Sequence, residues 1–275
     1  MAGAEVMHFC LPAAHVVLVE GPGTRSIASS RGELSAARGL YEEALSIARE
    51  IGDRRSVSMG LQCLGTVAHD AGDYAMAQAL LEECVSISRD IGAWRVAVAL
   101  SELGDVRHAR GDLEAARSML LEALAGQREL GDKPGIAKAL IRLAIVSHDR
   151  RDIAAARAHL GEALESVPTG DALSQVTWLD AYAGLTLDFA GATCAARLWG
   201  CTQRLREEMG SPMTTPERAR HESLLAAARS TPHDDAAFEL AWNEGRSWSL
   251  DEALQYARKD RGHEARPVAA PDAAS

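Results

Sequence analysis

Three histidines and one aspartate recur at a fixed place in a repeated sequence pattern, and their spacing is the one best suited to chemistry. Each stands four residues after a small residue of the repeat, which would place them at equivalent positions on successive helices. They are His69, His108, His148 and Asp188. Histidine titrates near neutral pH, so such a row could bind an acidic ligand or a metal ion. The alternative is that each histidine packs and hydrogen-bonds between adjacent helices, and the sequence leaves both interpretations open.

Other candidate sites lack residues that their chemistry needs. A glycine-rich stretch at 21–26 follows an apolar run, as a phosphate loop does, but it has no lysine at the required spacing. His221-Glu222 has no second histidine one turn later, and no G-x-S-x-G occurs. Cys194 and Cys201 have no nearby histidine or aspartate to complete four metal ligands. The sequence therefore predicts no catalytic residues, no cofactor and no metal site.

The composition favours a helical protein. Of 275 residues, 47% are hydrophobic but only 4% are aromatic, so the core must be built from Leu, Ala, Ile and Val. The formal net charge of −10 argues against direct nucleic-acid binding, which needs a basic surface. The first Lys or Arg is Arg25, so no signal peptide is predicted, and no apolar run reaches the ~18 residues of a membrane span. We expect a cytoplasmic protein with no membrane contact and with reduced cysteines.

A turn followed by an alanine recurs about every forty residues. The clearest turns are Gly72-Asp73 and Gly111-Asp112. The alanines recur at intervals of 40, 39, 40 and 40 residues, at Ala37, Ala77, Ala116, Ala156 and Ala196. Twelve residues before each of the later four stands a small residue: Gly65, Gly104, Ala144 and Gly184. Self-similarity at this period indicates stacked helical hairpins rather than one globular core.

The small residues predict where the helices touch. Glycine inside a helix costs ~0.5–1 kcal/mol relative to alanine, so its recurrence needs a packing reason. Gly65 on a first helix and Ala77 on a second helix would let the two cross at ~8–10 Å. The Gly-Asp pair between them ends one helix and caps the next.

The Leu-Gly pair at 64–65, the Gly-Asp-Tyr turn at 72–74 and the later alanine are similar to the tetratricopeptide repeat, which is usually shorter, at about 34 residues. The longer unit resembles the long-repeat variety in bacterial signalling ATPases. The resemblance covers residues 32–208, with three strong and two degenerate units. It implies an all-α fold, a right-handed α-solenoid of tetratricopeptide-type helical hairpins with a C-terminal helical cap.

Residues 209–262 are expected to form that cap, and residues 263–275 a disordered tail rich in Ala and Pro. The cap helices are predicted near 216–230, 234–245 and 249–260. Ser249 and Glu252 form a capping box at the start of the last helix. This region resembles the C-terminal end of large bacterial regulators that carry an NTPase module and an output domain of LuxR or another type.

The first 31 residues fit the repeat less well. Residues 12–23 carry strand-like and turn-like signals where the partner of a helix at 33–51 should lie. Residues 1–31 are therefore expected to be an atypical segment, irregular or partly disordered. One explanation is that the chain is a truncated piece of a longer regulator. The other is that residues 5–20 fold over the edge of the stack as an irregular cap.

The predicted function is binding of a protein or peptide in a concave groove lined by the first helices. Candidate groove residues mix both charge signs with apolar groups: Met59, Gln62, Thr66, His69, Asp70, Ser101, Asp105, His108, Lys138, Ile145, His148, Trp178 and Asp188. The leading hypothesis is a scaffold or sensor arm resembling the C-terminal part of a bacterial transcription regulator or signalling NTPase, whose NTPase or DNA-binding portion would lie in missing sequence. The alternatives are a free-standing tetratricopeptide adaptor and a small-molecule-binding module that uses the three histidines.

Overall fold

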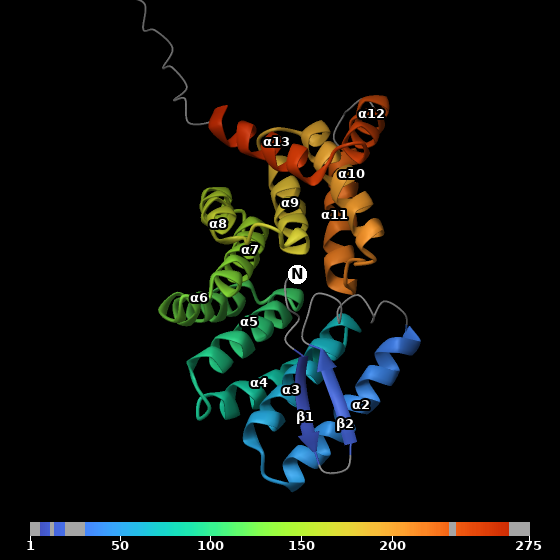
Figure 1. The fold of residues 1–275 in the computed structure, drawn as a ribbon. Helices are drawn as coiled ribbons and strands as arrows, with labels where there is room; N and C mark the ends of the chain where they lie inside the picture. Colours follow the sequence, from blue (N-terminus) through green and yellow to red (C-terminus); the bar gives the residue numbers. More distant parts are fainter. Residues whose placement is uncertain (1–5, 12–13, 20–30, 231–234, 264–275) are drawn as a thin grey trace, which may run out of the picture.

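The computed structural model describes residues 6–11, 14–19, 31–230 and 235–263, and helices follow one another along most of them (Figure 1). The strands are β1 (Val6–Leu11) and β2 (Ala14–Val19). The helices of the stack are α2 (Arg31–Glu50), α3 (Arg54–Asp70), α4 (Tyr74–Ser88), α5 (Ala93–Ala109), α6 (Leu113–Leu130), α7 (Lys133–Asp149), α8 (Ile153–Ser166), α9 (Ala172–Thr186) and α10 (Ala192–Met209). The C-terminal helices are α11 (Thr215–Ser230), α12 (Asp235–Arg246) and α13 (Leu250–His263). The three predicted cap helices are confirmed within two residues at most boundaries.

The N-terminal segment contains a pair of strands, the second of which lies where the sequence carries strand-like signals. β1 and β2 pair antiparallel, in a register that runs from Val6 opposite Val19 to Leu11 opposite Ala14. The expectation of an irregular segment over 1–31 is corrected for these residues, whose two short runs are apolar and rich in valine, a composition that favours strands. The stretch at 21–26 that resembled a phosphate loop, and all but the first residue of the predicted tail, lie outside the described residues.

The turns that lead into α4, α6 and α8 each consist of a left-handed residue followed by a capping aspartate, whereas the turn into α10 has Gly191 and no side-chain cap. Gly72 has a φ of +84°, and the Asp73 carboxylate accepts a hydrogen bond from the backbone N–H of Met76. The next turn repeats this arrangement, with a φ of +81° at Gly111. The third turn places Arg151 at a φ of +63°, a conformation that costs a residue with a Cβ about 1–2 kcal/mol. The predicted stop-and-cap turn is thus confirmed.

Glycines of the first helices make room for leucines of the second. A Cβ added to Gly65 would lie 2.6 Å from Cγ of Leu81, and one added to Gly104 would lie 2.9 Å from Cγ of Leu120. Ala77 is fully buried. The prediction of close helix contact at Gly65 is confirmed, but Leu81 rather than Ala77 fills the space.

The hairpins stack into an all-α solenoid. α3 packs on α4, α5 on α6 and α7 on α8, and each second helix also packs on the next first helix. In Figure 1 the second helices α6 and α8 lie at the left edge of the molecule, and the first helices α5, α7 and α9 lie nearer its middle. Buried Leu, Ala, Ile and Val fill the interfaces. The predicted fold class is confirmed.

The last hairpin merges with the C-terminal helices. α10 packs mainly against α12, and α13 contacts both α9 and α10. A Cβ on Gly200 would collide with the backbone carbonyl of Trp242, and one on Gly245 with the carbonyl of Arg197. The two backbones therefore cross with no side chain between them. The capping box at the start of α13 is confirmed, because Ser249 N–H donates to the Glu252 carboxylate at 2.7 Å.

Candidate functional site

Arg142 of α7 ties the first helices together on one face, called here the inner face. Its guanidinium lies 2.7 Å from the Asp105 carboxylate and 3.2 Å from that of Glu102, both on α5, and it donates to the hydroxyl of Ser101. Glu102 also accepts a hydrogen bond from Thr66 of α3, at 3.5 Å. These charged side chains are 14–20% exposed, so solvent screens the ion pairs less than at an open surface.

Two of the histidines bridge neighbouring repeats. Nε2 of His108 lies 2.7 Å from a carboxylate oxygen of Asp149, and Nε2 of His148 lies 2.7 Å from one of Asp188. In each case a first helix is joined to a residue of the following repeat. These contacts match the alternative stated for the row of histidines, namely hydrogen bonding between adjacent helices.

His69, at the start of the row, lies among carboxylates. Its Nδ1 is 3.2 Å from Asp70, and the ring is mostly buried. Burial alone would lower the pKa of His69, but the hydrogen bond with Asp70 and the charges of Asp105 and Glu102 together raise it. These carboxylates thus favour the protonated form of the ring, against the effect of its burial.

Asp149 has the most strongly shifted carboxyl group of this face. Burial would raise the pKa of Asp149, but the hydrogen bond with His108 and the charge of Arg220 outweigh burial and lower it to about 2. The carboxylate therefore remains charged throughout the physiological pH range.

Helix α11 lies against the inner face at α7 and α9. Nη2 of Arg220 is 3.1 Å from the Asp149 carboxylate and donates to Nδ1 of His148 at 2.9 Å. One turn later, Leu224 fits against Gly184, where a Cβ would be 2.9 Å from Cδ1 of the leucine. A cavity of about 60 Å³ remains beside α11, lined in part by Ile145. The chain's own helix thus covers this part of the predicted groove.

The predicted groove residues divide by exposure. Trp178 is fully buried, stacks on Tyr182 and donates to the carbonyl of Leu160 at 2.8 Å, so its placement in the groove is corrected. Met59 and Ser101 are also buried, at 5% and 2% exposure. Those that are partly or fully exposed are Gln62, Thr66, Asp70, Asp105, His108, Lys138, Ile145 and Asp188, whereas His69 and His148 are mostly buried.

Sequence reasoning missed four residues of the inner face: Glu102, Arg142, Asp149 and Arg220. Glu102 and Arg142 each stand two residues before the small residue of their repeat, so comparison of that position would have predicted the ion pair. Arg220 had no such signal, because the repeat pattern does not include α11.

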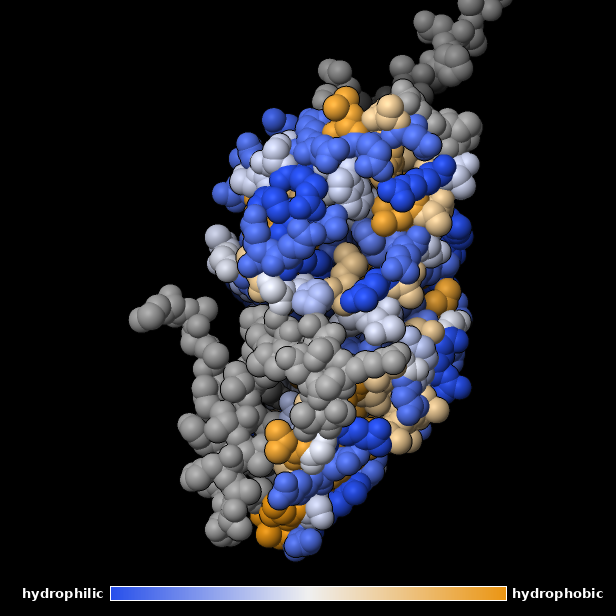
Figure 2. Space-filling model, turned by 90° about the vertical axis from the view of Figure 1, so that its right-hand side faces the viewer, coloured by the Kyte–Doolittle hydropathy of each residue, from blue (hydrophilic) through white to orange (hydrophobic). Residues whose placement is uncertain are grey.

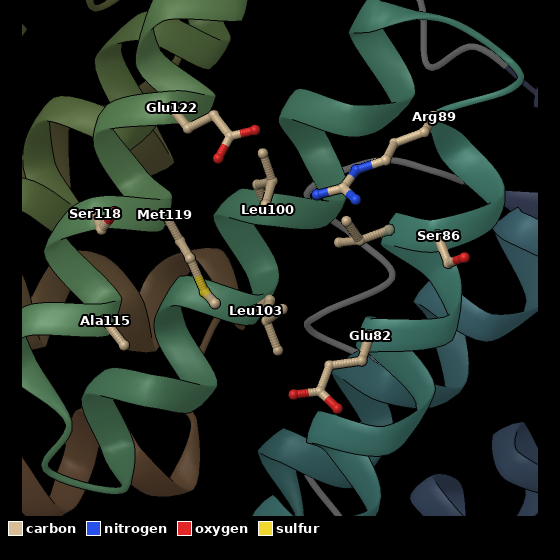
Figure 3. A pocket seen from close by; sticks show the side chains of 10 residues that line it. Glu82, Ser86, Arg89, Leu100, Leu103, Ala115, Ser118, Met119 and Glu122 are labelled. Atoms are coloured by element: carbon tan, nitrogen blue, oxygen red, sulfur yellow. The ribbon is translucent and has the colours of Figure 1, made fainter.

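A second depression, called here the outer groove, lies between α4 and α6 and over α5, on the outer face formed by the second helices. It has a volume of about 430 Å³, and its floor includes Leu100 and Leu103. Arg89 and Glu122 stand on opposite walls (Figure 3). In the coloured part of the face in Figure 2, apolar side chains lie in small separate groups among hydrophilic ones.

The arrangement suits binding. Among the described residues, no three histidine, cysteine or carboxylate side chains converge to hold a metal ion. Within the same part of the chain, no helix combines the length and apolar character needed to cross a membrane. The side chains that do converge on the inner face form ion pairs and hydrogen bonds, which can be exchanged for contacts with a partner.

Comparison with known proteins identifies the repeat unit. Tetratricopeptide-repeat models match residues 95–168, from α5 to the end of α8, and residues 63–83. The structure is similar to one titled "Crystal structure of BtubC (BKLC) from P. vanneervenii", with a TM-score of 0.51 and 15% identity, covering 88% of this chain and 96% of that one. At this identity the likeness shows a shared fold. No curated protein sequence matches the chain.

Proposed function

We propose that this chain is a protein-interaction scaffold that binds a basic segment of a partner protein along the inner face of α3, α5 and α7. The tetratricopeptide units found over residues 63–83 and 95–168 support the scaffold role. The choice of the inner face and of a basic segment rests on the charges of the first helices.

The observation that carries the proposal is the contact of Arg220 with Asp149. There a helix places a guanidinium on an inner-face carboxylate and a leucine one turn later against a glycine. The same face of α3 and α5 carries Asp70, Glu102 and Asp105. A segment rich in Arg or Lys would complement these carboxylates, and complementary charge raises both the rate and the specificity of association.

Site-specific photo-crosslinking in the source cells tests the proposal. A crosslinking side chain at Thr66 should capture a partner, whereas the same group at Glu129, exposed on α6, serves as the matched control. The adduct at position 66 should disappear when Asp70→Asn and Glu102→Gln are combined. Equal adducts at both positions, or an adduct that survives the double substitution, would contradict the proposal.

A second proposal is that the chain is the sensor arm of a transcription regulator or signalling NTPase. It is favoured by α11, because a segment already seated on the inner face could be displaced by a partner and so report binding. Discovery of a longer reading frame with a Walker lysine would support it. Unchanged hydrogen exchange in α11 on partner binding would argue against it.

The small-molecule alternative has less support than the scaffold. Nε2 of His108 and of His148 already lies 2.7 Å from a carboxylate, so neither nitrogen is available without breaking a bond between repeats. A variant with all three histidines changed to glutamine provides the test, and a binding profile against pH that stays unchanged would remove this alternative.

A further inference from the structure

Pairs of Arg and Glu recur between successive second helices on the outer face. Arg49 of α2 lies 2.7 Å from Glu83 of α4, and Arg128 of α6 pairs with Glu162 of α8. The repeat intervals make these pairs equivalent. Each bridges the junction between one second helix and the next.

The junction between α4 and α6 breaks this pattern. Arg89 and Glu122 occupy the equivalent positions, yet within the described residues no ion pair joins them or engages either side chain. Instead the outer groove opens between them (Figure 3). The third charge of the groove, Glu82, is already bound by Arg107 at 2.8 Å.

Two repeat positions differ between this junction and its neighbours, one from the preceding junction and one from the following junction. Ala115 of α6 stands where α4 has Met76, so a long side chain is replaced by a methyl group. At the following junction, α8 has His159 in place of Met119, and that ring contacts Ser147 at 3.4 Å beside the Arg128 pair. The α6 wall of the groove thus has neither the methionine found at this place on α4 nor the histidine found on α8.

We propose that this outer groove is a second docking surface, which binds a short amphipathic helix of a partner protein. The floor is apolar, with Val85, Leu100 and Leu103 all at least 93% buried and Met119 partly buried. A helix lying between α4 and α6 would place apolar side chains at i and i+4 on this floor.

The walls specify the charges of that helix. Arg89 on the α4 side and Glu122 on the α6 side are both exposed, so a carboxylate of the bound helix would pair with the first and a Lys or Arg with the second. At the neighbouring junctions the equivalent Arg and Glu pair with each other. Here each of the two would instead pair with an opposite charge on the bound helix. Small wall residues, Ala115 and Ser118 on α6 and Ser86 on α4, allow its backbone to approach closely.

Selection from a displayed library of helical 14-residue peptides tests this docking surface on the full chain. Recovered peptides should carry apolar residues at i and i+4 flanked by one acidic and one basic residue. Their affinity should fall about tenfold or more for Ala115→Met, which puts in the groove the long side chain that α4 has at Met76, and for Arg89→Glu. Ala155→Met, the same change at the next junction, is the matched control and should leave affinity unchanged.

Two results would overturn the inference. One is a selection in which no recovered peptide depends on Ala115 and Arg89. The other is a double-mutant cycle in which Arg89 and Glu122 are coupled as strongly as Arg49 and Glu83, because the groove would then be closed by its own ion pair. Circular-dichroism melts of each variant confirm that the solenoid remains folded. None of these measurements depends on the inner face.

Discussion

One position of the second helices, sixteen residues after the small residue of the first helix, makes different contacts in the two halves of the solenoid. In the N-terminal hairpins, Gly65 and Gly104 each face a leucine sixteen residues later on the second helix. In the last repeat that leucine is replaced by Gly200, which instead meets the backbone of α12. A side chain can shift to relieve a clash, whereas a backbone crossing has little freedom. The comparison indicates that the N-terminal stack is adaptable and the C-terminal crossing is rigid.

The inner face follows the same division. At α3 and α5 its carboxylates are bound by side chains of neighbouring first helices, Arg142 of α7 and Thr66 of α3. At α7 and α9 it is covered by α11 through Arg220 and Leu224. The half that can adapt is also the half left open to a partner.

The largest effect is expected for Gly245→Ala. The new Cβ would collide with the backbone carbonyl of Arg197, so the free energy of unfolding should fall by about 3 kcal/mol or more in urea titrations. Gly39→Ala in α2 is the control, because nothing lies within 4 Å of its Cβ and a gain of ~0.5–1 kcal/mol is expected. Similar effects of both substitutions would refute a backbone crossing at Gly245.

Gly65→Ala should have a smaller effect, since the Leu81 side chain can adjust. Overpacking is offset in part by the better helix propensity of alanine, so a loss of about 1–2 kcal/mol is expected. The same urea titration measures it. A loss as large as that of Gly245→Ala would remove the distinction between the two halves.

Acid should weaken the covered half through Asp149. Its folded-state pKa of about 2 lies below the ordinary value of 3.8, so its contribution is full above about pH 4 and is lost as pH falls through 2. With allowance for partial exposure, this contribution is on the order of 1–2 kcal/mol. Asp149→Asn should reduce the slope of stability against pH between 4 and 2. An unchanged slope would contradict the assigned interactions.

Arg220→Ala should release α11 with a local cost on the order of 1 kcal/mol, because the ion pair is partly exposed. Hydrogen exchange should become faster in α11 and stay the same in α3 and α5. Arg229→Ala is the control, since its pair with Glu239 is more than half exposed. Faster exchange throughout the stack would mean that α11 supports the whole solenoid rather than covering one face.

The smallest effect is expected for His69 in the open half, which titrates at a higher pH than Asp149. Its pKa is raised on folding, so its contribution is full below about pH 6.5 and is lost as pH rises through the folded-state pKa. The stability of the unmodified chain should decline as the pH rises above about 6.5, and His69→Gln should flatten that decline. If the unmodified chain shows no such decline, the carboxylates around His69 do not act as described.

The sequence predicted what depends on local chemistry. Gly72 and Asp73 specify a turn by backbone freedom and capping, and Ser249 with Glu252 specifies a helix start, so these features were predictable. The face on which α11 lies depends on contacts between residues 71 apart, Arg220 and Asp149, which no periodicity encodes. Trp178 was assigned to the groove from its place in the repeat, but its indole is drawn into the core by Tyr182 and Leu160.

The crossing of α10 and α12 gives the array a direction of unravelling. In a linear stack each unit is held only by its neighbours, so melting starts at the weaker end. At one end Leu40 of α2 and Ile51, just after it, are each 55% exposed, whereas at the other end the backbones of α10 and α12 cross in contact. When the protein is heated or pulled, unfolding would therefore begin at α2 and move along the stack. The helices α10 and α12 would unfold last, and the stack would refold against them.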